Sequence, residues 1–246
     1  MLVSVVARRA RALSKSGVVA GSLMGTIAIA AGWSWGALLL SLFISVSLLS
    51  RLGAADKAKR ISGLIEKGDE RDASQLIANG AVFTVAALGS LLVPSSAWYA
   101  IAAGAVSFSA ADTWATEIGT LAGGDPRSII NGRRVPAGTS GGVSLVGTLG
   151  AIAGALFIAA EVRFAAWPVS LAGVLLGGII GGLADSIVGA TLQVKRWCSR
   201  CMVETERTVH DCGTPTTVSG GIGWLDNDVV NAVCSAIGAL IALGLQ

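Results

Sequence analysis

Two short sequences, Ala-Asp-Thr at residues 111–113 and Ala-Asp-Ser at residues 184–186, each place a carboxylate inside a long apolar run. An Asp at the centre of a membrane helix costs roughly 2.5–3.5 kcal/mol on insertion scales, so such a residue is expected to face a polar partner rather than lipid. Asp112 and Asp185 are therefore expected to face each other, a cation or a polar ligand. A structural hydrogen bond, or a proton or ion relay in a transporter, would use the same residues.

More carboxylates are expected on the same side of the membrane as these two residues. Asp226 and Asp228 precede the last apolar run, and Glu117 follows Asp112 closely. Several carboxylates beside a glycine-rich loop are typical of a site where Mg²⁺ is shared between the protein and the oxygens of a phosphate substrate. The alternative for Asp226 and Asp228 is capping of the helix that follows them.

The glycine-rich sequence at residues 138–142 leads into another apolar run. A helix N-terminus offers unpaired N–H groups and partial positive charge, and glycine lets an oxyanion approach the backbone closely. Because Arg133 lies just upstream and Lys15 lies at the inner end of another run, we expect a phosphate site here. Close helix packing is the alternative interpretation, and it is favoured for Gly147 and Gly150.

Three cysteines and the only histidine of the chain lie between the last two apolar runs. Cys198 and Cys201 are separated by two residues, and His210 and Cys212 by one. Structural Zn²⁺ takes four ligands of these types, so a structural zinc site is one prediction. The alternative is a set of reduced, unligated thiols, since the cytoplasm disfavours a disulfide.

Seven apolar runs must position these residues. The composition is typical of a membrane protein, with 53% hydrophobic and 13% charged residues and a mean hydropathy of +0.71, whereas soluble domains carry about 25% charged residues. Each run is close to the ~20 residues that cross a bilayer. We predict an all-α, polytopic transmembrane helix bundle of about seven spans that forms a single domain over residues 1–246. The runs are residues 16–31, 33–50, 76–93, 97–121, 141–160, 168–192 and 229–245.

The basic residues predict the orientation of the bundle. With a cytoplasmic N-terminus, 17 of the 18 Lys and Arg residues fall on the cytoplasmic side and only Arg163 falls outside, as the positive-inside rule requires. We expect cytoplasmic loops at residues 51–75 and 194–227, an outer C-terminus, and a site that faces the cytoplasm at the cell's inner membrane. Tryptophans at the outer ends of the runs are expected to form an aromatic belt: Trp33, Trp35, Trp98 and Trp167.

Five stretches follow one another along the chain, at residues 75–80, 111–119, 135–144, 185–193 and 224–231. This succession resembles the integral-membrane family that includes phytyl-phosphate kinase of plants and cyanobacteria and human transmembrane protein 19. The resemblance covers nearly the whole chain. It implies phosphorylation of an isoprenyl monophosphate, such as phytyl or geranylgeranyl phosphate, to the diphosphate, with CTP as donor by similarity to phytol and dolichol kinases.

The resemblance and the residues together give an expected site that contains Mg²⁺ and CTP. The other expected partners are the isoprenyl monophosphate and the lipid bilayer, with no nucleic acid, and a homo-oligomer is left open. The expected catalytic residues are Asp112, Glu117, Asp185 and Asp228, and the expected Mg²⁺ ligands are Asp112, Asp185, Asp226 and Asp228. Phosphate or nucleotide is expected at Lys15, Asn79, Arg133, Gly138, Thr139, Ser140, Gly141, Gly142, Gln193 and Asn231.

Two other functions use the same residues. A CTP-dependent cytidylyltransferase acting on a lipid phosphate would need the same nucleotide and metal but would release pyrophosphate. A transporter of isoprenyl phosphate or of an ion would use the buried Asp residues for coupling, and a weak repeat between residues 22–27 and 144–149 would suit alternating access. Against transport, the outer half of every run is almost devoid of polar side chains.

Overall fold

The computed structural model describes the whole chain except residues 1 and 62–69. The described part contains nine helices and five short strands. The helices are α1 (Leu2–Arg9), α2 (Lys15–Ala31), α3 (Trp33–Arg51), α4 (Ala54–Ile61), α5 (Ala73–Leu92), α6 (Ser96–Ala122), α7 (Leu145–Phe164), α8 (Leu171–Thr191) and α9 (Asn227–Gly244). The strands are β1 (Arg127–Ser128), β2 (Gly142–Val143), β3 (Lys195–Cys198), β4 (Val203–Thr205) and β5 (Thr217–Gly220).

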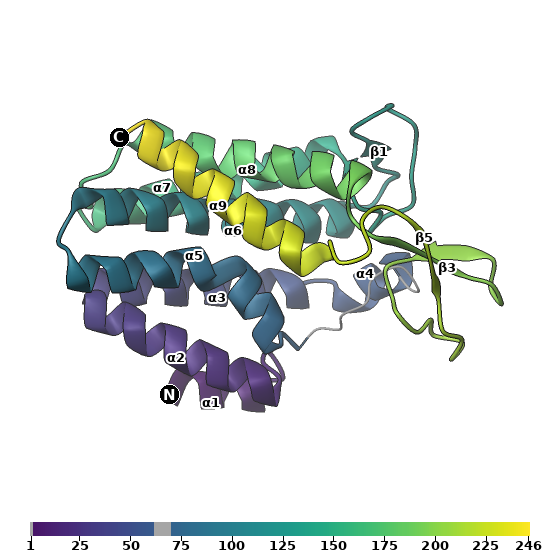
Figure 1. Ribbon diagram of the computed structural model, residues 1–246, viewed down its shortest axis with the longest axis horizontal. Helices are drawn as coiled ribbons and strands as arrows, with labels where there is room; N and C mark the ends of the chain where they lie inside the picture. The colour runs from purple at the N-terminus through teal and green to yellow at the C-terminus, as the bar shows by residue number, and fades with distance from the viewer. Residues whose placement is uncertain (1, 62–69) are drawn as a thin grey trace.

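Helices α2, α3 and α5–α9 form a bundle, while α4 and the strands gather at one of its ends (Figure 1). We call this end the loop end; its described part comprises residues 52–61, 70–72, 123–144 and 192–226. Among the described helices, α3, α5, α7, α8 and α9 are long and apolar enough to cross a membrane. Helix α2 is apolar but has 17 residues, and α6 has 27 residues and contains Asp112 and Glu117. The predicted helical membrane bundle is confirmed, whereas the count of seven spans and the orientation of the termini stay predictions.

Side-chain caps determine where several helices begin. Ser14, Ser144, Ser170 and Asp226 each accept a hydrogen bond from the backbone N–H three residues later. Asp72 does the same within a capping box. Such side chains satisfy N–H groups that a helix leaves unpaired at its start. Asp72, Ser144 and Asp226 lie at the loop end, and Ser14 is bonded to it through its backbone N–H, which donates to the backbone oxygen of Arg71, so this end collects the polar side chains.

The structure differs from the predicted all-α fold in the region 194–227. Here β3 lies between β4 and β5 in an antiparallel sheet, and Arg196 is opposite Thr205 on one side and Val218 on the other. A second antiparallel pair joins β1 to β2. These strands have two to four residues, which is too short for the alternation that reveals a strand in a sequence.

Glycines allow three helices of the bundle to approach one another closely. A Cβ added to Gly177 of α8 would lie 2.6 Å from the carbonyl oxygen of Gly238 in α9, and one on Gly238 would lie 2.8 Å from that of Gly104 in α6. On α7, a Cβ at Gly147 or Gly150 would meet backbone oxygens of α6 at 3.1 and 2.8 Å. The packing interpretation of Gly147 and Gly150 is therefore confirmed.

Two tryptophans differ from the predicted aromatic belt. Trp35 is 1% exposed and packs against Phe83, Tyr99 and Trp167, with ring centroids 4.8–5.6 Å apart. Trp167 is 7% exposed, whereas Trp33, which fits the belt, is 83% exposed. When every face of a helix is apolar, the sequence does not show which face is buried, and for Trp35 and Trp167 the belt interpretation is wrong.

The weak sequence repeat is not matched by equivalent helix packing. In a repeat of α2, α3 and α5 by α7, α8 and α9, corresponding pairs would make corresponding contacts. Helix α5 packs against α2, but α9 packs against α8 instead of α7. This difference removes one of the features that favoured a transporter.

Candidate functional site

A cavity of about 1080 Å³ lies at the loop end and extends between the helices of the bundle. Ligand pockets commonly have volumes of roughly 300–1,000 Å³, so this cavity has room for a large ligand or for two. Its walls come from most helices of the bundle and from the segments 123–144 and 193–211. Most of the residues predicted as a site meet here.

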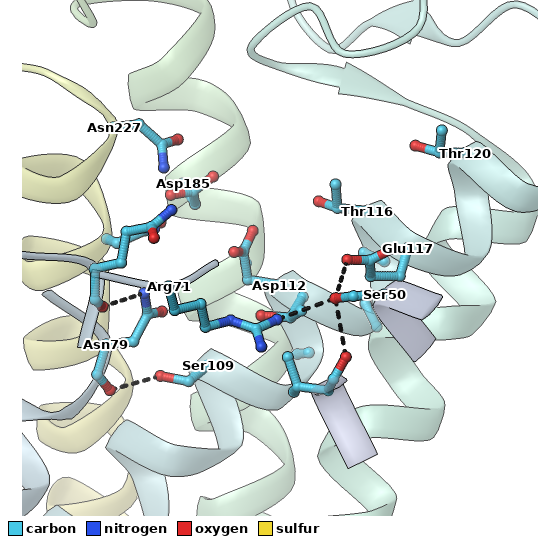
Figure 2. Close-up of a pocket in the computed structure, with 18 of the residues that line it drawn as sticks. Ser50, Arg71, Asn79, Ser109, Asp112, Thr116, Glu117, Thr120, Asp185 and Asn227 are labelled. Atoms are coloured by element: carbon cyan, nitrogen blue, oxygen red, sulfur yellow. Dashed lines mark hydrogen bonds between the residues drawn. The ribbon is translucent and has the colours of Figure 1, made fainter. Parts of the chain in front are cut away.

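Asp112 of α6 and Asp185 of α8 both line the cavity and are close enough to interact electrostatically. The two helices approach closely because α8 has glycines facing α6, at Gly178 and Gly181. Figure 2 shows both carboxylates directed into the same space. The Oδ1 atom of Asp185 is buried and has no hydrogen-bond partner in the part of the chain that the structure describes. Because a buried, unpaired carboxylate oxygen is costly, this arrangement fits a bound cation.

Asn79 of α5 adds a neutral oxygen to the same cavity. Its Nδ2 donates to the backbone oxygen of Gln75 at 3.1 Å, whereas its Oδ1 is buried and has no partner among the described residues. Ser109 of α6 donates to the backbone oxygen of Asn79 at 2.9 Å and so ties the two helices together (Figure 2). Asn231, at the start of α9, is 6% exposed and also lines the cavity.

The glycine-rich segment 138–142 lies on α8 next to Asp185. Gly141 has a φ of +75°, and an added Cβ would lie 2.6 Å from the carbonyl oxygen of Ser186, so glycine is needed here for both conformation and space. The segment lines the cavity as predicted. However, it is not the first turn of a helix, because α7 begins at Leu145 and Ser144 caps it. The prediction of a helix N-terminus at this segment is therefore wrong, and the segment is instead a loop that packs against Ser186 and Ala190 of α8.

A hydrogen-bond network joins this segment to the three-stranded sheet. Gln193 is 3% exposed, and its Nε2 donates to Oε1 of Glu206 at 2.9 Å. The hydroxyl of Ser140 donates to the same oxygen. Sequence reasoning missed Glu206 because it lies in a region predicted to be a loop, where a single carboxylate gives no signal.

Three cationic side chains of the cavity, Lys57, Arg71 and Arg207, were also missed, and Lys57 is paired with a predicted catalytic residue. The Nζ of Lys57 in α4 lies 2.5 Å from Oε2 of Glu117 and donates to the backbone oxygen of Leu49 at 2.7 Å. Ser50 donates to the other oxygen of Glu117 at 2.6 Å, and Arg71 donates to Ser50 at 3.1 Å. Figure 2 shows the contacts from Arg71 through Ser50 to Glu117. Glu117 is thus held by an ion pair and a hydroxyl.

The remaining predicted residues divide between the cavity and the surface. Asp226 and Asp228 both line the cavity, and Asp226 accepts from the backbone N–H of Val229 at 3.0 Å, so the capping interpretation is confirmed for Asp226. Lys15 and Arg133 are exposed and do not line the cavity. Their neighbours in segment 123–144 and in α2 do line it, so the two side chains differ from those neighbours in direction, which the sequence could not reveal.

The predicted zinc ligands gather in a second cluster, within the three-stranded sheet and its connections. One ligand atom from each of Cys198, Cys201, His210 and Cys212 lies within 4.8 Å of all the others. Hydrogen bonds with Thr214 and His210 lower the pKa of Cys212 to about 5. Hydrogen bonding to Cys212 raises the pKa of Cys201 to about 11. This cluster is distinct from the cavity residues, although the segment 206–211 belongs to both regions.

The chain is similar to one described family and to several known proteins. The family described as integral membrane protein DUF92 matches residues 1–239. Protein PGR of Arabidopsis thaliana is 30% identical, and the match covers 94% of this chain and 88% of that protein. An uncharacterized membrane protein of Methanocaldococcus jannaschii is 29% identical, with 98% of this chain and 89% of that protein covered. Protein VTE6, chloroplastic, of Arabidopsis thaliana is 29% identical, with 95% of this chain and 65% of that protein covered.

No solved structure matches the chain significantly. The family match extends over nearly all of the sequence, including every helix that lines the cavity except the last turn of α9. The family resemblance found in the sequence is confirmed. The chain belongs to the integral membrane protein family DUF92.

Proposed function

We propose that this protein is a membrane-embedded isoprenyl-phosphate kinase, which converts phytyl, geranylgeranyl or a similar monophosphate to the diphosphate with CTP as donor. The observation that carries the proposal is one cavity with two kinds of wall. Carboxylates, amides and hydroxyls line it at the loop end, whereas Met24, Ile29, Leu39 and Phe43 of α2 and α3 line it within the bundle. An amphiphile with a phosphate head and an apolar tail matches this distribution.

The proposal includes seven spans, α2, α3 and α5–α9, with the loop end in the cytoplasm and the C-terminus outside. The distribution of Lys and Arg supports this orientation, because Arg163 lies in the last turn of α7, at the opposite end from the loop end. A cytoplasmic loop end gives the site access to nucleotide triphosphates. In a bacterial cell the membrane would be the inner membrane.

The charges of the cavity favour a bound divalent cation. Among the described residues, seven carboxylate side chains line it against three cationic ones, and Lys57 and Arg207 are paired with Glu117 and Asp211 at 2.5 Å. A phosphate ester would be repelled by this excess of negative charge. Mg²⁺ would supply the missing charge and would polarise the phosphate oxygens when bound. The residues that would hold it are Asp112, Asp185 and Asp228, with Asn79 as a neutral ligand.

The protein's own groups would then position the two phosphates. The segment 138–142 lines the cavity with backbone N–H groups and the hydroxyl of Thr139, and Arg71 lines it near Ser50 (Figure 2). An oxygen of the lipid monophosphate attacks the γ-phosphorus of CTP, the bond between that phosphorus and the β-γ bridging oxygen breaks, and CDP leaves. Since the attacking group is already an anion, no protein nucleophile is required, and positioning and electrostatics supply the catalysis.

Thermal unfolding of the purified protein in detergent tests the metal-phosphate site without requiring turnover. Geranylgeranyl monophosphate with Mg²⁺ should raise the apparent Tm, because a ligand at 100 times its Kd stabilises the folded state by about 2.7 kcal/mol. Free geranylgeraniol with Mg²⁺ should raise it much less, since it lacks the phosphate. Equal stabilisation by both lipids, or stabilisation by the phosphate that does not depend on Mg²⁺, would contradict the proposed site.

A further inference from the structure

The cluster of Cys198, Cys201, His210 and Cys212 lies in a part of the chain that the phosphoryl-transfer proposal does not use. Cys198 ends β3, and Cys201 lies in the turn between β3 and β4. His210 and Cys212 come from the connection between β4 and β5. The sheet therefore brings together two pairs of ligands from separate turns, in the way that structural zinc sites are commonly built.

The distances within the cluster agree with a tetrahedral metal site. Bond lengths of about 2.3 Å for Zn–S and about 2.0 Å for Zn–N place the ligand atoms of a tetrahedral ion roughly 3.5–3.8 Å apart. The Sγ atoms of Cys198 and Cys212 are 3.6 Å apart, and Nδ1 of His210 is 3.4 Å from Sγ of Cys212. All four cysteines of the chain are free, so no disulfide links the cluster. Three thiols and one imidazole, with their ligand atoms all within 4.8 Å of one another, are the donor set of a closed Cys₃His site.

The surrounding sheet needs such a site, because it has almost no core. Within residues 195–220, all of which are described, the buried side chains are Cys198, Thr205 and His210. The strands have three or four residues each. An isolated sheet of this size does not bury enough apolar surface to be stable, and small folds of this kind are usually held by a metal or disulfides. Two of the three buried residues are themselves metal-ligand types.

The cluster also fixes a segment that reaches the cavity. Glu206, Arg207 and Asp211 line the cavity, and they lie between the last residue of β4 and Cys212. Glu206 accepts hydrogen bonds from Ser140 and Gln193, which connect the sheet to the glycine-rich segment. An ion that holds His210 and Cys212 against Cys198 and Cys201 would therefore hold this wall of the cavity as well.

We propose that Cys198, Cys201, His210 and Cys212 bind one structural Zn²⁺, and that this ion holds the segment 206–211 in place against the cavity. Zinc is the metal that fits a thiolate-rich, tetrahedral site with no open position, and it contributes directly to folding in such sites. The ion has no part in phosphoryl transfer. The zinc site can therefore be tested independently of the proposed kinase activity.

Metal analysis of the full-length protein, purified in detergent without chelator, tests the first half of the proposal. Inductively coupled plasma mass spectrometry should find one zinc per chain and no stoichiometric iron. Cys212→Ser should reduce the zinc content to background. Cys234→Ser is the matched control, since Cys234 is buried in α9 away from the cluster, and it should keep the full zinc content.

If Cys212→Ser does not fold, release of zinc from the unmodified protein by a thiol-modifying mercurial gives the same information. No zinc in the unmodified protein, together with no uptake of added Zn²⁺, would overturn the site.

Limited proteolysis tests the second half. Trypsin cleavage after Arg200 and Arg207, which lie in this segment and its hairpin, should become at least about tenfold faster when a chelator strips the zinc, because local opening then exposes the segment. Cleavage after Arg127, which begins β1, and after Arg134, in the β1–β2 connection, should change little. If the zinc is bound but its removal leaves cleavage at Arg207 unchanged, the ion does not hold the wall of the cavity. If geranylgeranyl monophosphate with Mg²⁺ still raises the Tm after the zinc is lost, the phosphate site does not depend on the zinc site. The two proposals are then tested separately.

Discussion

Replacing Asp185 by Asn should lower the turnover of an isoprenyl monophosphate at least about 100-fold, equivalent to about 2.7 kcal/mol of transition-state stabilisation. The Oδ1 atom of Asp185 is buried and has no hydrogen-bond partner among the described residues, so its charge is available for a cation. The amide keeps the shape of the side chain but removes that charge. Asp112→Asn should behave in the same way, because both carboxylates line one space. Initial rates with increasing Mg²⁺ concentration, in detergent, measure the effect.

Two further variants separate a metal-binding role from a structural one. Asp185→Glu keeps the charge and should recover part of the activity at raised Mg²⁺ concentration. Asp125→Asn is the matched control, because Asp125 is an exposed carboxylate that lies outside the cavity and pairs with Arg134 at 3.7 Å. It should retain normal rates. Full activity in both Asp112→Asn and Asp185→Asn would remove these residues from the site.

Lys57→Met should destabilise the protein by about 3–5 kcal/mol, the usual cost of breaking a buried ion pair by removing one partner. The side chains of Lys57 and Glu117 are 7% and 20% exposed, and Lys57 also donates to the backbone oxygen of Leu49. Without the ammonium group, the carboxylate of Glu117 keeps the hydroxyl of Ser50 but loses its counter-charge. The apparent Tm in detergent should fall by on the order of 10 °C.

A double-mutant cycle shows whether this loss comes from the ion pair. Lys57→Met combined with Glu117→Gln should recover much of the lost stability, because no buried charge is then left without a partner. Arg134→Met serves as the surface control: its partner Asp125 is 64% exposed, so the pair should contribute no more than about 1 kcal/mol. Strictly additive effects of the two changes at 57 and 117 would show that the pair is not coupled.

The parts of the site that sequence reasoning found are those with a strong local signal. Insertion of a carboxylate into a membrane helix costs free energy. Asp112 and Asp185 could therefore be identified as candidate site residues without any knowledge of their neighbours. The spacing of Cys198 and Cys201, together with the single histidine, likewise indicates a ligand cluster before the sheet is known. In both cases the chemistry depends on residue types that are unusual in their surroundings.

The parts that sequence reasoning missed depend on tertiary contacts. Lys57, Arg71 and Glu206 lie in segments outside the apolar runs. Charged side chains are common in such segments, so their presence does not indicate a functional site. Their role in the cavity arises because α4 and the three-stranded sheet fold against the bundle. Ser144 is a different case, since serine is a common N-cap, and a stricter use of capping rules would have started α7 at Leu145.

The measurement that tests the central claim most directly is a product assay with the purified protein in detergent. Phytyl or geranylgeranyl monophosphate and Mg²⁺ are incubated with CTP, or with ATP in a parallel reaction, and the products are identified by mass spectrometry. The proposed kinase should form the isoprenyl diphosphate together with CDP, and the product should be absent with Asp185→Asn. A CDP-linked lipid with pyrophosphate would instead show a cytidylyltransferase. No product with either donor, from folded protein that binds the lipid phosphate, would contradict the kinase and favour transport.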